Sequence, residues 1–360
     1  VNLGLMWHLL GGTLGLPWAA APGQLMALAA YGLPTYRNEI IEWGGGLLAS
    51  LSPTAVKECL GPLASLVWSP YVDRHRVRLR ASTGERLGLP RYRNLNATPP
   101  FDREAADLAA SLQYVTEETM LYLAGELREI TGLPAVCVCG GVGLNCRANE
   151  RLVRSGPFEN VYLPPAMHDG GLALGAALYG LHRLDPIRRR PELGRTGWGI
   201  CHDRSVTAAC LRAEGVSFVE ASSPVPVARR LAEGALVGFF EGGAELGPRA
   251  LGHRSILADP RSEVGRDRLN IAKRRAYYRP VAPSLAAAAI ETYFPGASDC
   301  RFMARAMAGG ASARALLPGA LHRDGTARVQ SVLDDGSVFH ALHSAFADET
   351  GGPALLQTSF

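Results

Sequence analysis

The sequence predicts an α/β protein with two domains. Short apolar runs end in glycine turns and lead into helices, the order by which α/β folds place ligands at the carboxyl edge of a sheet. With 360 residues, 47% of them hydrophobic and 19% charged, the chain can bury more than one core. The best linker is the proline- and arginine-rich run at 183–199. We therefore expect domains over residues 1–195 and 196–360.

The apolar amino end, residues 1–34, is expected to be buried core rather than a membrane segment. Residues 4–15 have helical spacing that the pair Gly11 and Gly12 should interrupt, and residues 22–32 indicate a second helix or turn. Prolines and glycines break the apolar run before it reaches membrane-spanning length, and no signal peptide is evident. Arginine alternates with apolar residues over 74–80, typical of an exposed strand. Seven scattered cysteines favour buried thiols in a reducing cytoplasm.

The middle of the chain predicts helices followed by two strand-and-turn units. One helix is expected over 101–115, capped by Asp102, and another over 117–131, ending at Gly132. A buried strand then runs into the glycine turn of GGVGLNCRAN and a new helix. The next strand leads to Asp169, which is either a helix N-cap or a carboxylate beside a nucleotide. As a metal ligand, Asp169 would need histidines or waters to complete the shell.

Residues 239–280 form the most informative stretch. They follow an apolar run, Ala235–Phe240, that predicts a buried strand. Three glycines, Gly242, Gly243 and Gly247, would let backbone N–H groups approach a ligand, and arginine forks suit phosphate or carboxylate oxygens. Lysine occurs only twice in the chain, and one of the two is Lys273. An anion site is therefore expected, with a solvated basic surface loop as the alternative; its cations are Arg249, His253, Arg254, Lys273, Arg275 and Arg279.

The rest of the second domain predicts alternating helices and strands. Arg328 and Gln330 should share one face of an alternating strand near residues 322–332, so Arg328 could face the same anion. The chain starts at Val1 and stops inside the expected strand at 353–360, which suggests a fragment of a longer protein. Helices are expected at 205–214, 225–234, 284–291 and 338–350, and a further strand at 216–220.

Several motifs, in this order, make the sequence resemble the NodU/CmcH/TobZ family of O-carbamoyltransferases. They are LGLMWHLL with AYG, GGVGLNCRAN, HDGGLALGAAL, FFEGGAELGPRALGHRSILADPR, NIAKRRAYYRPVAPS, DGTARVQSV and LLQTSF. Members pair an actin-like (ASKHA) domain, akin to tRNA threonylcarbamoyl-adenosine transferases, with a YrdC-like α/β domain. The resemblance implies a partial actin-like domain over 1–195 and a YrdC-like domain over 196–360.

The resemblance also implies a reaction and its site residues. The second domain would form carbamoyl-adenylate from carbamoyl phosphate and ATP with Mg²⁺, and the first would pass the carbamoyl group to a hydroxyl of a small-molecule natural product. A divalent metal such as Fe²⁺ would lie near the adenylate, with Asp169 as its ligand. By motif, Arg249, Lys273, Arg279 and Arg328 would be catalytic, and with Ser359 would bind carbamoyl phosphate; Gly140, Gly141, Asn145 and Gly171 would lie near the nucleotide.

Departures from the family pattern shape the expected partners. The first segment of the family, which supplies metal-binding histidines and the proposed base, is absent, so this polypeptide alone should not complete the transfer. Gln24 stands where relatives usually carry a lysine. The net charge of +4 is small for this length, so we expect no nucleic acid as a partner. No membrane is expected, and a homodimer stays open.

Three other functions stay open. The first is a tRNA threonylcarbamoyl-type modification protein, which would need salt-sensitive tRNA binding by the basic stretches. The second is a hydrogenase-maturation carbamoyltransferase, which would normally carry paired-cysteine zinc motifs that this sequence lacks. The third is a non-catalytic nucleotide-binding scaffold. The order and number of the motifs favour the O-carbamoyltransferase.

Overall fold

The computed structural model describes residues 3–41, 103–186, 196–297 and 300–360. These form two compact units that interleave along the chain. The first unit is drawn from Val1–Cys137, Arg147–Tyr162 and Arg275–Arg279, and the second from Val138–Cys146, Leu163–Arg274 and Pro280–Phe360. The domain boundary expected at residue 195 stays a prediction. The expected strand at 74–80, the cap Asp102 and most of the expected linker lie outside the described residues.

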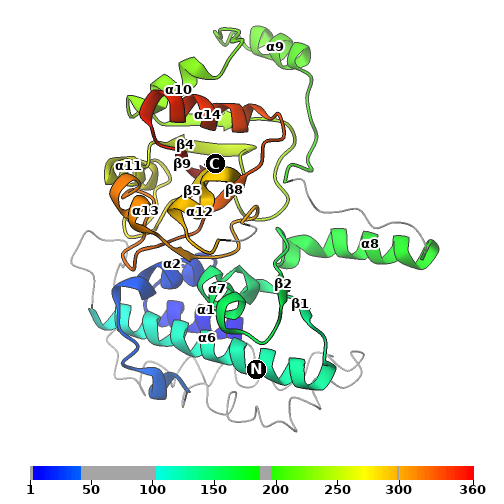
Figure 1. The fold of residues 1–360 in the computed structure, drawn as a ribbon, viewed down its shortest axis with the longest axis vertical. Helices are drawn as coiled ribbons and strands as arrows, with labels where there is room; N and C mark the ends of the chain where they lie inside the picture. The colour runs from blue at the N-terminus through cyan, green and yellow to red at the C-terminus, as the bar shows by residue number, and fades with distance from the viewer. Residues whose placement is uncertain (1–2, 42–102, 187–195, 298–299) are drawn as a thin grey trace. The chain divides into compact units, whose positions relative to one another are not determined.

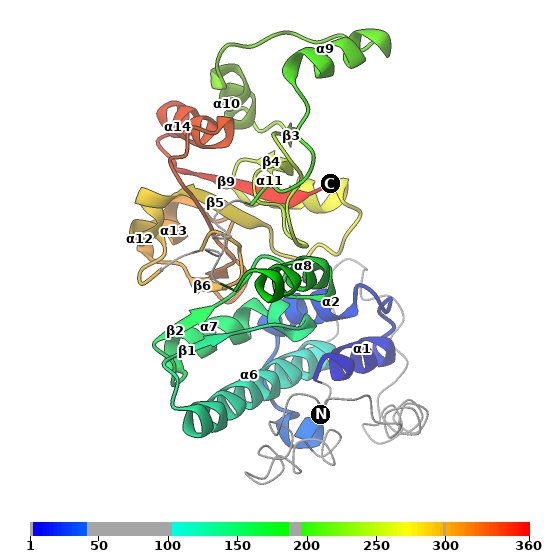
Figure 2. The same ribbon diagram turned by 90° about the vertical axis from the view of Figure 1, so that its right-hand side faces the viewer.

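Helices dominate the first unit. Helix α6 (Arg103–Thr131) lies beside α2 (Ala21–Leu28) and the short η1 (Ala29–Tyr31), and α1 (Leu3–Thr13) packs on α2. Figure 2 shows α6 as the long helix of this unit. The indole N–H of Trp7 donates a buried hydrogen bond to Thr116 Oγ1 at 3.1 Å, which ties α1 to α6. Apolar and small residues at helical spacing thus build one shared core.

Two expectations for these helices are wrong. Residues 101–115 and 117–131 were expected as two helices, but α6 is continuous because no glycine or proline separates them and buried positions recur through Thr119. The pair Gly11 and Gly12 does not interrupt α1. A Cβ on Gly11 would lie 2.3 Å from the Cβ of Ala21, so this glycine allows two helices to pack closely.

A parallel strand pair confirms the α/β character of this region. Strand β1 (Ala135–Cys137) pairs with β2 (Asn160–Tyr162), and α7 (Cys146–Ser155) lies between them in the chain. Cys137 and Cys139 are exposed, whereas Cys146 and Cys300 are buried, so the expectation of buried thiols holds for only some of the cysteines. Among the described helices, none has both the length and the apolar composition that crossing a membrane requires.

The second unit is built on a five-stranded mixed sheet with the order β3-β4-β9-β5-β8. The pairs β3–β4, β4–β9 and β5–β9 are antiparallel, and β5–β8 is parallel. The chain therefore places its last strand in the centre of the sheet. The strands are β3 (Val237–Phe240), β4 (Arg254–Ala258), β5 (Ala282–Ala286), β8 (Gln330–Val332) and β9 (Ala354–Ser359).

Helices cover both faces of this sheet (Figure 1). One core joins α10 (Val225–Ala232) and α14 (Val338–Thr350) to the face that carries Leu257 and Leu355. The other joins the opposite face, with Ala258 and Leu356, to the remaining helices. Side chains of a strand alternate between faces, so adjacent residues serve different cores. The helices of this second core are α11 (Glu263–Ala272), α12 (Ile290–Tyr293) and α13 (Ala311–Leu316).

Other elements differ in how far they are buried. A small antiparallel pair is formed by β6 (Met307–Ala308) and β7 (Thr326–Ala327). The helices α8 (Leu172–Leu184) and α9 (Arg204–Ala213) have no buried residue. The helices expected at 205–214, 225–234 and 338–350 are confirmed as α9, α10 and α14.

Three expectations in this unit need correction. The alanine-rich run at 284–291 is strand β5 followed by the short helices η5 (Ala287–Ala289) and α12, because burial between β9 and β8 outweighs the helix propensity of alanine. No strand is described at 216–220, where Val219 is 91% exposed and lacks a neighbouring strand. The alternating strand near 322–332 is divided between β7 and β8.

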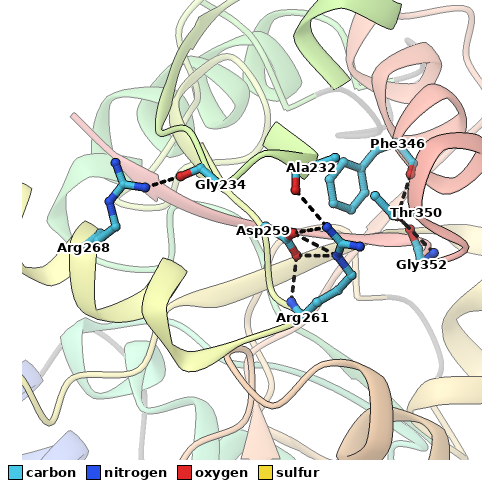
Figure 3. Close-up of polar contacts among 8 residues, drawn as sticks. All are labelled: Ala232, Gly234, Asp259, Arg261, Arg268, Phe346, Thr350 and Gly352. Atoms are coloured by element: carbon cyan, nitrogen blue, oxygen red, sulfur yellow. Dashed lines mark hydrogen bonds and ion pairs between the residues drawn. The ribbon is translucent and has the colours of Figure 1, made fainter. Parts of the chain in front are cut away.

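Two arginines of the second unit serve as structural cations at the end of α10 (Figure 3). Arg261 binds the carboxylate of Asp259 and donates to Ala232 O at 3.0 Å, and Arg268 donates to Gly234 O. The guanidinium of Arg261 also lies over the ring of Phe346 on α14. Cations at a helix carboxyl end satisfy its last carbonyl groups. These two arginines therefore stabilise the fold.

A buried imidazole links α14 to the sheet. His343 lies 3.0 Å from Ser284 Oγ on β5 and 3.3 Å from the carbonyl oxygen of Pro353. Its ring makes an edge contact with the ring of Phe339. Burial lowers the pKa of His343 from 6.5 to about 4, so the folded protein keeps this imidazole neutral.

Candidate active site

One end of the five-stranded sheet collects most of the residues predicted for the site. The register pairs Phe240 with Arg254 and Ser255 with Ser359, so the β3–β4 connection and the end of β9 lie together. Strands β5 and β8 begin at the same end. We name residues 241–253, which join β3 to β4, the Arg249 loop. Arg328, just before β8, and Ser359 therefore lie at the end of the sheet that carries this loop.

The Arg249 loop contacts the glycine turn directly. Arg249 Nη2 donates to the carbonyl oxygen of Leu144 at 3.1 Å. Leu144 ends η3 (Gly141–Leu144), which leads to the buried Asn145. Two motifs far apart in the sequence thus meet, although they were expected at two separate sites.

The glycine turn leaves open space at two of its three glycines. Gly140 has φ +101°, where a side chain would be strained, and its N–H donates to Met167 O at 2.6 Å. A Cβ on Gly140 or Gly141 would have no heavy atom within 4 Å, whereas one on Gly143 would lie 2.7 Å from the sulfur of Met167. Gly140 and Gly141 are therefore open to a ligand, and Gly143 is needed for packing.

The segment around Asp169 lies next to both motifs. A Cβ on Gly247 of the Arg249 loop would lie 2.2 Å from Pro165 O, and one on Gly171 would lie 2.0 Å from Ala166 O. Gly171 is therefore required by its own turn, and its place near a nucleotide stays a prediction. Asp169 is exposed and begins η4 (Asp169–Gly171) rather than capping α8, because η4 precedes that helix.

The described residues do not form a complete metal site. No group of three or more histidine, cysteine, aspartate or glutamate side chains suited to a metal is present in the described ranges. Asp169 and His168 offer only two donors, and a divalent transition metal usually takes more from the protein. The role of Asp169 as a metal ligand therefore stays a prediction.

Arg328 is a buried cation at the end of the sheet that carries the Arg249 loop. Its Nε is buried and has no hydrogen-bond partner among the described residues. Burial lowers the pKa of its guanidinium, and the nearby Cys146 partly opposes that effect. Because Cys146 follows Asn145, Arg328 lies close to the end of the glycine turn. A buried guanidinium without a counter-charge is costly unless an anion pairs with it.

Lys273 and Arg279 belong to different units of the chain. Lys273 is partly buried at the end of α11, in the segment that leads to β5. Arg279 belongs to the first unit, where its guanidinium lies 3.7 Å from where a Cβ on Gly23 would stand. The neighbouring Gln24 is buried, and its Oε1 has no hydrogen-bond partner among the described residues. The roles of Lys273, Arg279 and Ser359 in binding carbamoyl phosphate stay predictions.

His253 in the Arg249 loop and Arg254 at the start of β4 contact the backbone of this loop. His253 Nδ1 lies 3.1 Å from Glu241 O, and His253 Nε2 lies 2.8 Å from Thr196 Oγ1. Arg254 donates to Glu241 O at 3.0 Å and to Gly242 O at 2.8 Å. Both were expected among the anion-binding cations. Their side chains instead hold the loop together.

Family models match both parts of the chain. The model described as "Carbamoyltransferase N-terminus" matches residues 1–178, and the model described as "Carbamoyltransferase C-terminus" matches residues 228–360. The chain belongs to the carbamoyltransferase family. The mixed α/β fold agrees with this family, and the closer assignment of actin-like and YrdC-like folds stays a prediction.

Curated relatives in the carbamoyltransferase family include nodulation proteins and an antibiotic enzyme. Nodulation protein NolNO of Sinorhizobium fredii is 34% identical over 94% of this chain and 47% of its own length. Nodulation protein U of Azorhizobium caulinodans is 39% identical over 55% of the chain and 34% of its own length. The 3′-hydroxymethylcephem-O-carbamoyltransferase of Amycolatopsis lactamdurans is 34% identical over 62% of this chain and 41% of its own length. This chain therefore spans about half the length of NolNO, and less of the other two.

Proposed function

We propose that this chain belongs to an ATP-dependent O-carbamoyltransferase that acts on a hydroxyl group of a small-molecule natural product. In the proposed reaction, water releases carbamate and phosphate from carbamoyl phosphate, and a carbamate oxygen attacks the α-phosphorus of ATP to give carbamoyl-adenylate and pyrophosphate. The acceptor oxygen then attacks the carbamoyl carbon, and AMP leaves as the acceptor loses its proton. The name of one relative, 3′-hydroxymethylcephem-O-carbamoyltransferase, describes such a transfer to a hydroxymethyl group.

The observation that carries the proposal is the buried guanidinium of Arg328. It lies near the glycine turn, and its Nε lacks a partner among the described residues. A phosphate group would supply both the missing acceptor and the missing negative charge. Carbamoyl phosphate and ATP both carry phosphate groups. Arg328 therefore fits the anion that either substrate would present.

The contact between Arg249 and the glycine turn supports the nucleotide part of the proposal. Arg249 uses Nη2 to hold the turn at Leu144, which fixes its positive charge beside the turn. Gly140 and Gly141 leave room for close approach of a ligand. A fixed cation beside an open turn can stabilise the charge that develops as a carbamoyl or adenylyl group is transferred.

ATP, Mg²⁺ and an iron-type metal belong to the proposal as co-substrate and cofactors. The arginines and the open glycines fit a phosphate-bearing nucleotide. Asp169 would be one ligand of a metal, which when bound would polarise the carbamoyl oxygen or the acceptor. Lys273 would add a compact positive charge at phosphate, and Ser359 would belong to the same carbamoyl phosphate site.

The test is product analysis with the full-length gene product. The protein is incubated with carbamoyl phosphate and ATP, and AMP and carbamoyl-adenylate are measured by mass spectrometry. A panel of hydroxylated natural products, added separately, should include one that gains a carbamoyl group. The absence of both nucleotide products in the presence of an authentic acceptor would contradict the proposal.

Arg328→Lys gives a second test, with Arg323→Lys as the matched control. Arg323 is exposed in the turn before β7. Lysine keeps the positive charge but lacks the planar fork of arginine, and loss of one pre-aligned donor in a water-excluded site typically lowers turnover by about 100-fold or more. We therefore expect Arg328→Lys to lose adenylate formation by that factor and Arg323→Lys to retain it. Equal rates of adenylate formation in the two variants would show that Arg328 is not part of the anion site.

A further inference from the structure

An acidic side chain, Glu245, lies at the centre of the Arg249 loop and binds the loop itself. Its Oε1 accepts backbone N–H groups from Leu251 at 3.0 Å, His253 at 2.9 Å and Arg254 at 2.8 Å. Backbone donors that converge in this way normally bind an external anion. Here the anion is a side chain of the same loop. These three N–H groups are therefore occupied within the protein.

The backbone of Glu245 is fixed as well as its carboxylate. It forms an antiparallel bridge with Gly197. On either side, Leu246 N donates to Thr196 O at 3.0 Å, and Ala244 O accepts from Trp198 N at 2.9 Å. A short extended segment at 196–199 therefore holds the first half of the Arg249 loop. The carboxylate of Glu245 therefore reaches the second half of the Arg249 loop from a fixed backbone position.

The hydrogen bond from Leu251 to Glu245 closes a turn that contains Arg249. Leu251 is also bound from its other side, because its carbonyl oxygen accepts from Gln330 Nε2 at 3.0 Å. Gln330 begins β8, two positions after Arg328. Leu251 thus connects the turn that carries Arg249 to the strand that follows Arg328. Both site arginines are attached to one hydrogen-bonded frame.

We propose that Glu245 is a positioning residue, which fixes the turn carrying Arg249 in the geometry that the anion site needs. The activity part of this inference rests on the proposed function. An arginine on a loose turn would lose conformational entropy on each binding event, and its charge would be misplaced. A carboxylate with three backbone donors on one oxygen orders the turn beforehand. Glu245 acts through Arg249 and does not touch the substrate.

The experiment compares Glu245→Gln, Glu245→Asp and Glu245→Ala in the full chain. Glutamine keeps the side-chain length and an oxygen acceptor but removes the charge. Aspartate keeps the charge but is one carbon shorter, so it cannot reach the same donors. Positioning therefore predicts the order Gln, Asp, Ala for retained function. A direct electrostatic role predicts that Asp exceeds Gln.

A matched control comes from another loop-binding glutamate. Glu291 on α12 accepts the backbone N–H of Gly296 at 3.0 Å, and it contacts no residue of the Arg249 loop in any described interaction. Glu291→Ala should loosen its own loop and leave adenylate formation unchanged. This control separates a general loss of order from a specific loss at the site.

Two readouts are taken. The first is amide hydrogen exchange of peptides covering 246–254, without ligand. The second is kcat and KM for carbamoyl phosphate in adenylate formation. We expect Glu245→Ala to raise exchange in this segment and to lower kcat/KM by about 100-fold, the typical effect of misplacing a catalytic group. Glu245→Gln should stay within about tenfold of the unsubstituted protein, since a neutral acceptor replaces the charged one.

The two readouts keep this inference separate from the proposed function. If the unsubstituted protein forms no adenylate, the proposed function fails, and exchange alone then decides whether Glu245 orders the turn. Unchanged exchange in Glu245→Ala overturns the inference in either case. An active protein in which Asp exceeds Gln overturns it as well. If Glu245→Ala does not fold, the comparison of Gln with Asp gives the same decision.

Discussion

Lowering the pH should destabilise the second unit through the buried imidazole of His343. The pKa of His343 is about 4 in the folded protein and 6.5 as a reference. Because the folded pKa is the lower one, between these values the unfolded state binds a proton that the folded state does not. The stabilisation is complete above the unfolded pKa and is lost as the pH falls toward about 4.

The size of the effect follows from the gap between the two pKa values. At about 1.4 kcal/mol per pH unit, the interval from 6.5 to about 4 corresponds to about 3 kcal/mol of unfolding free energy. About 2 kcal/mol of this should be lost by about pH 5. That loss is a large part of the total stability of a typical domain.

The assay is urea unfolding at a series of pH values, with His343→Gln as the test variant. Glutamine retains hydrogen-bonding groups but does not titrate, so the pH-dependent loss should shrink by about 2 kcal/mol at about pH 5. His340→Gln is the control, because His340 is partly exposed and pairs with Asp334 at 3.2 Å. It should keep most of the slope due to His343, because burial is the largest cause of the lowered pKa and the charge of His340 is a smaller one. Parallel pH profiles for the unsubstituted protein and His343→Gln would refute the reasoning.

Three other changes give separate tests. Gly252→Ala should lower the unfolding free energy, measured by thermal unfolding, by about 2 kcal/mol or more, because φ is +92° and the new Cβ would lie 2.3 Å from a phenylalanine ring on α14. The control Gly336→Ala, at φ +76° in open space, should lower the unfolding free energy by less. Lys273→Ala should abolish adenylate formation, whereas Asp169→Ala should spare it and impair transfer; loss of the same half-reaction in both would contradict this division. Arg261→Ala should lower the unfolding free energy by about 1 to 3 kcal/mol in urea titrations, because a carboxylate and a helix-end carbonyl lose their donor.

Most elements of the fold were predictable where local pattern and packing agree. Helix α14, strand β3 and strand β9 follow directly from apolar spacing and flanking turn residues. The alanine-rich residues of β5 could not be predicted, because their state depends on burial between two strands that come later in the chain. Residues 216–220 show the reverse case, since apolar composition without a neighbouring strand does not produce one.

The candidate site was predictable at the level of motifs but not of partners. The sequence indicated both the cation-rich stretch and the glycine turn, and the structure joins them through Arg249 and Leu144. It could not show that His253 and Arg254 face the loop backbone. Glu245 was missed altogether. An acid among glycines and arginines was the available signal, but which N–H groups it binds depends on the path of the whole loop.

The central position of β9 has a consequence for how the second unit forms. Strand β9 pairs with β4 on one side and β5 on the other, at Ser255↔Ser359 and Ala282↔Gln357. During synthesis, β3, β4, β5 and β8 all leave the ribosome before it. Until residues 354–359 arrive, β4 and β5 have no strand between them, and the edges that face β9 stay unpaired. Pairing over such long sequence separations is slow, so a nascent second unit should depend on chaperones until β9 inserts.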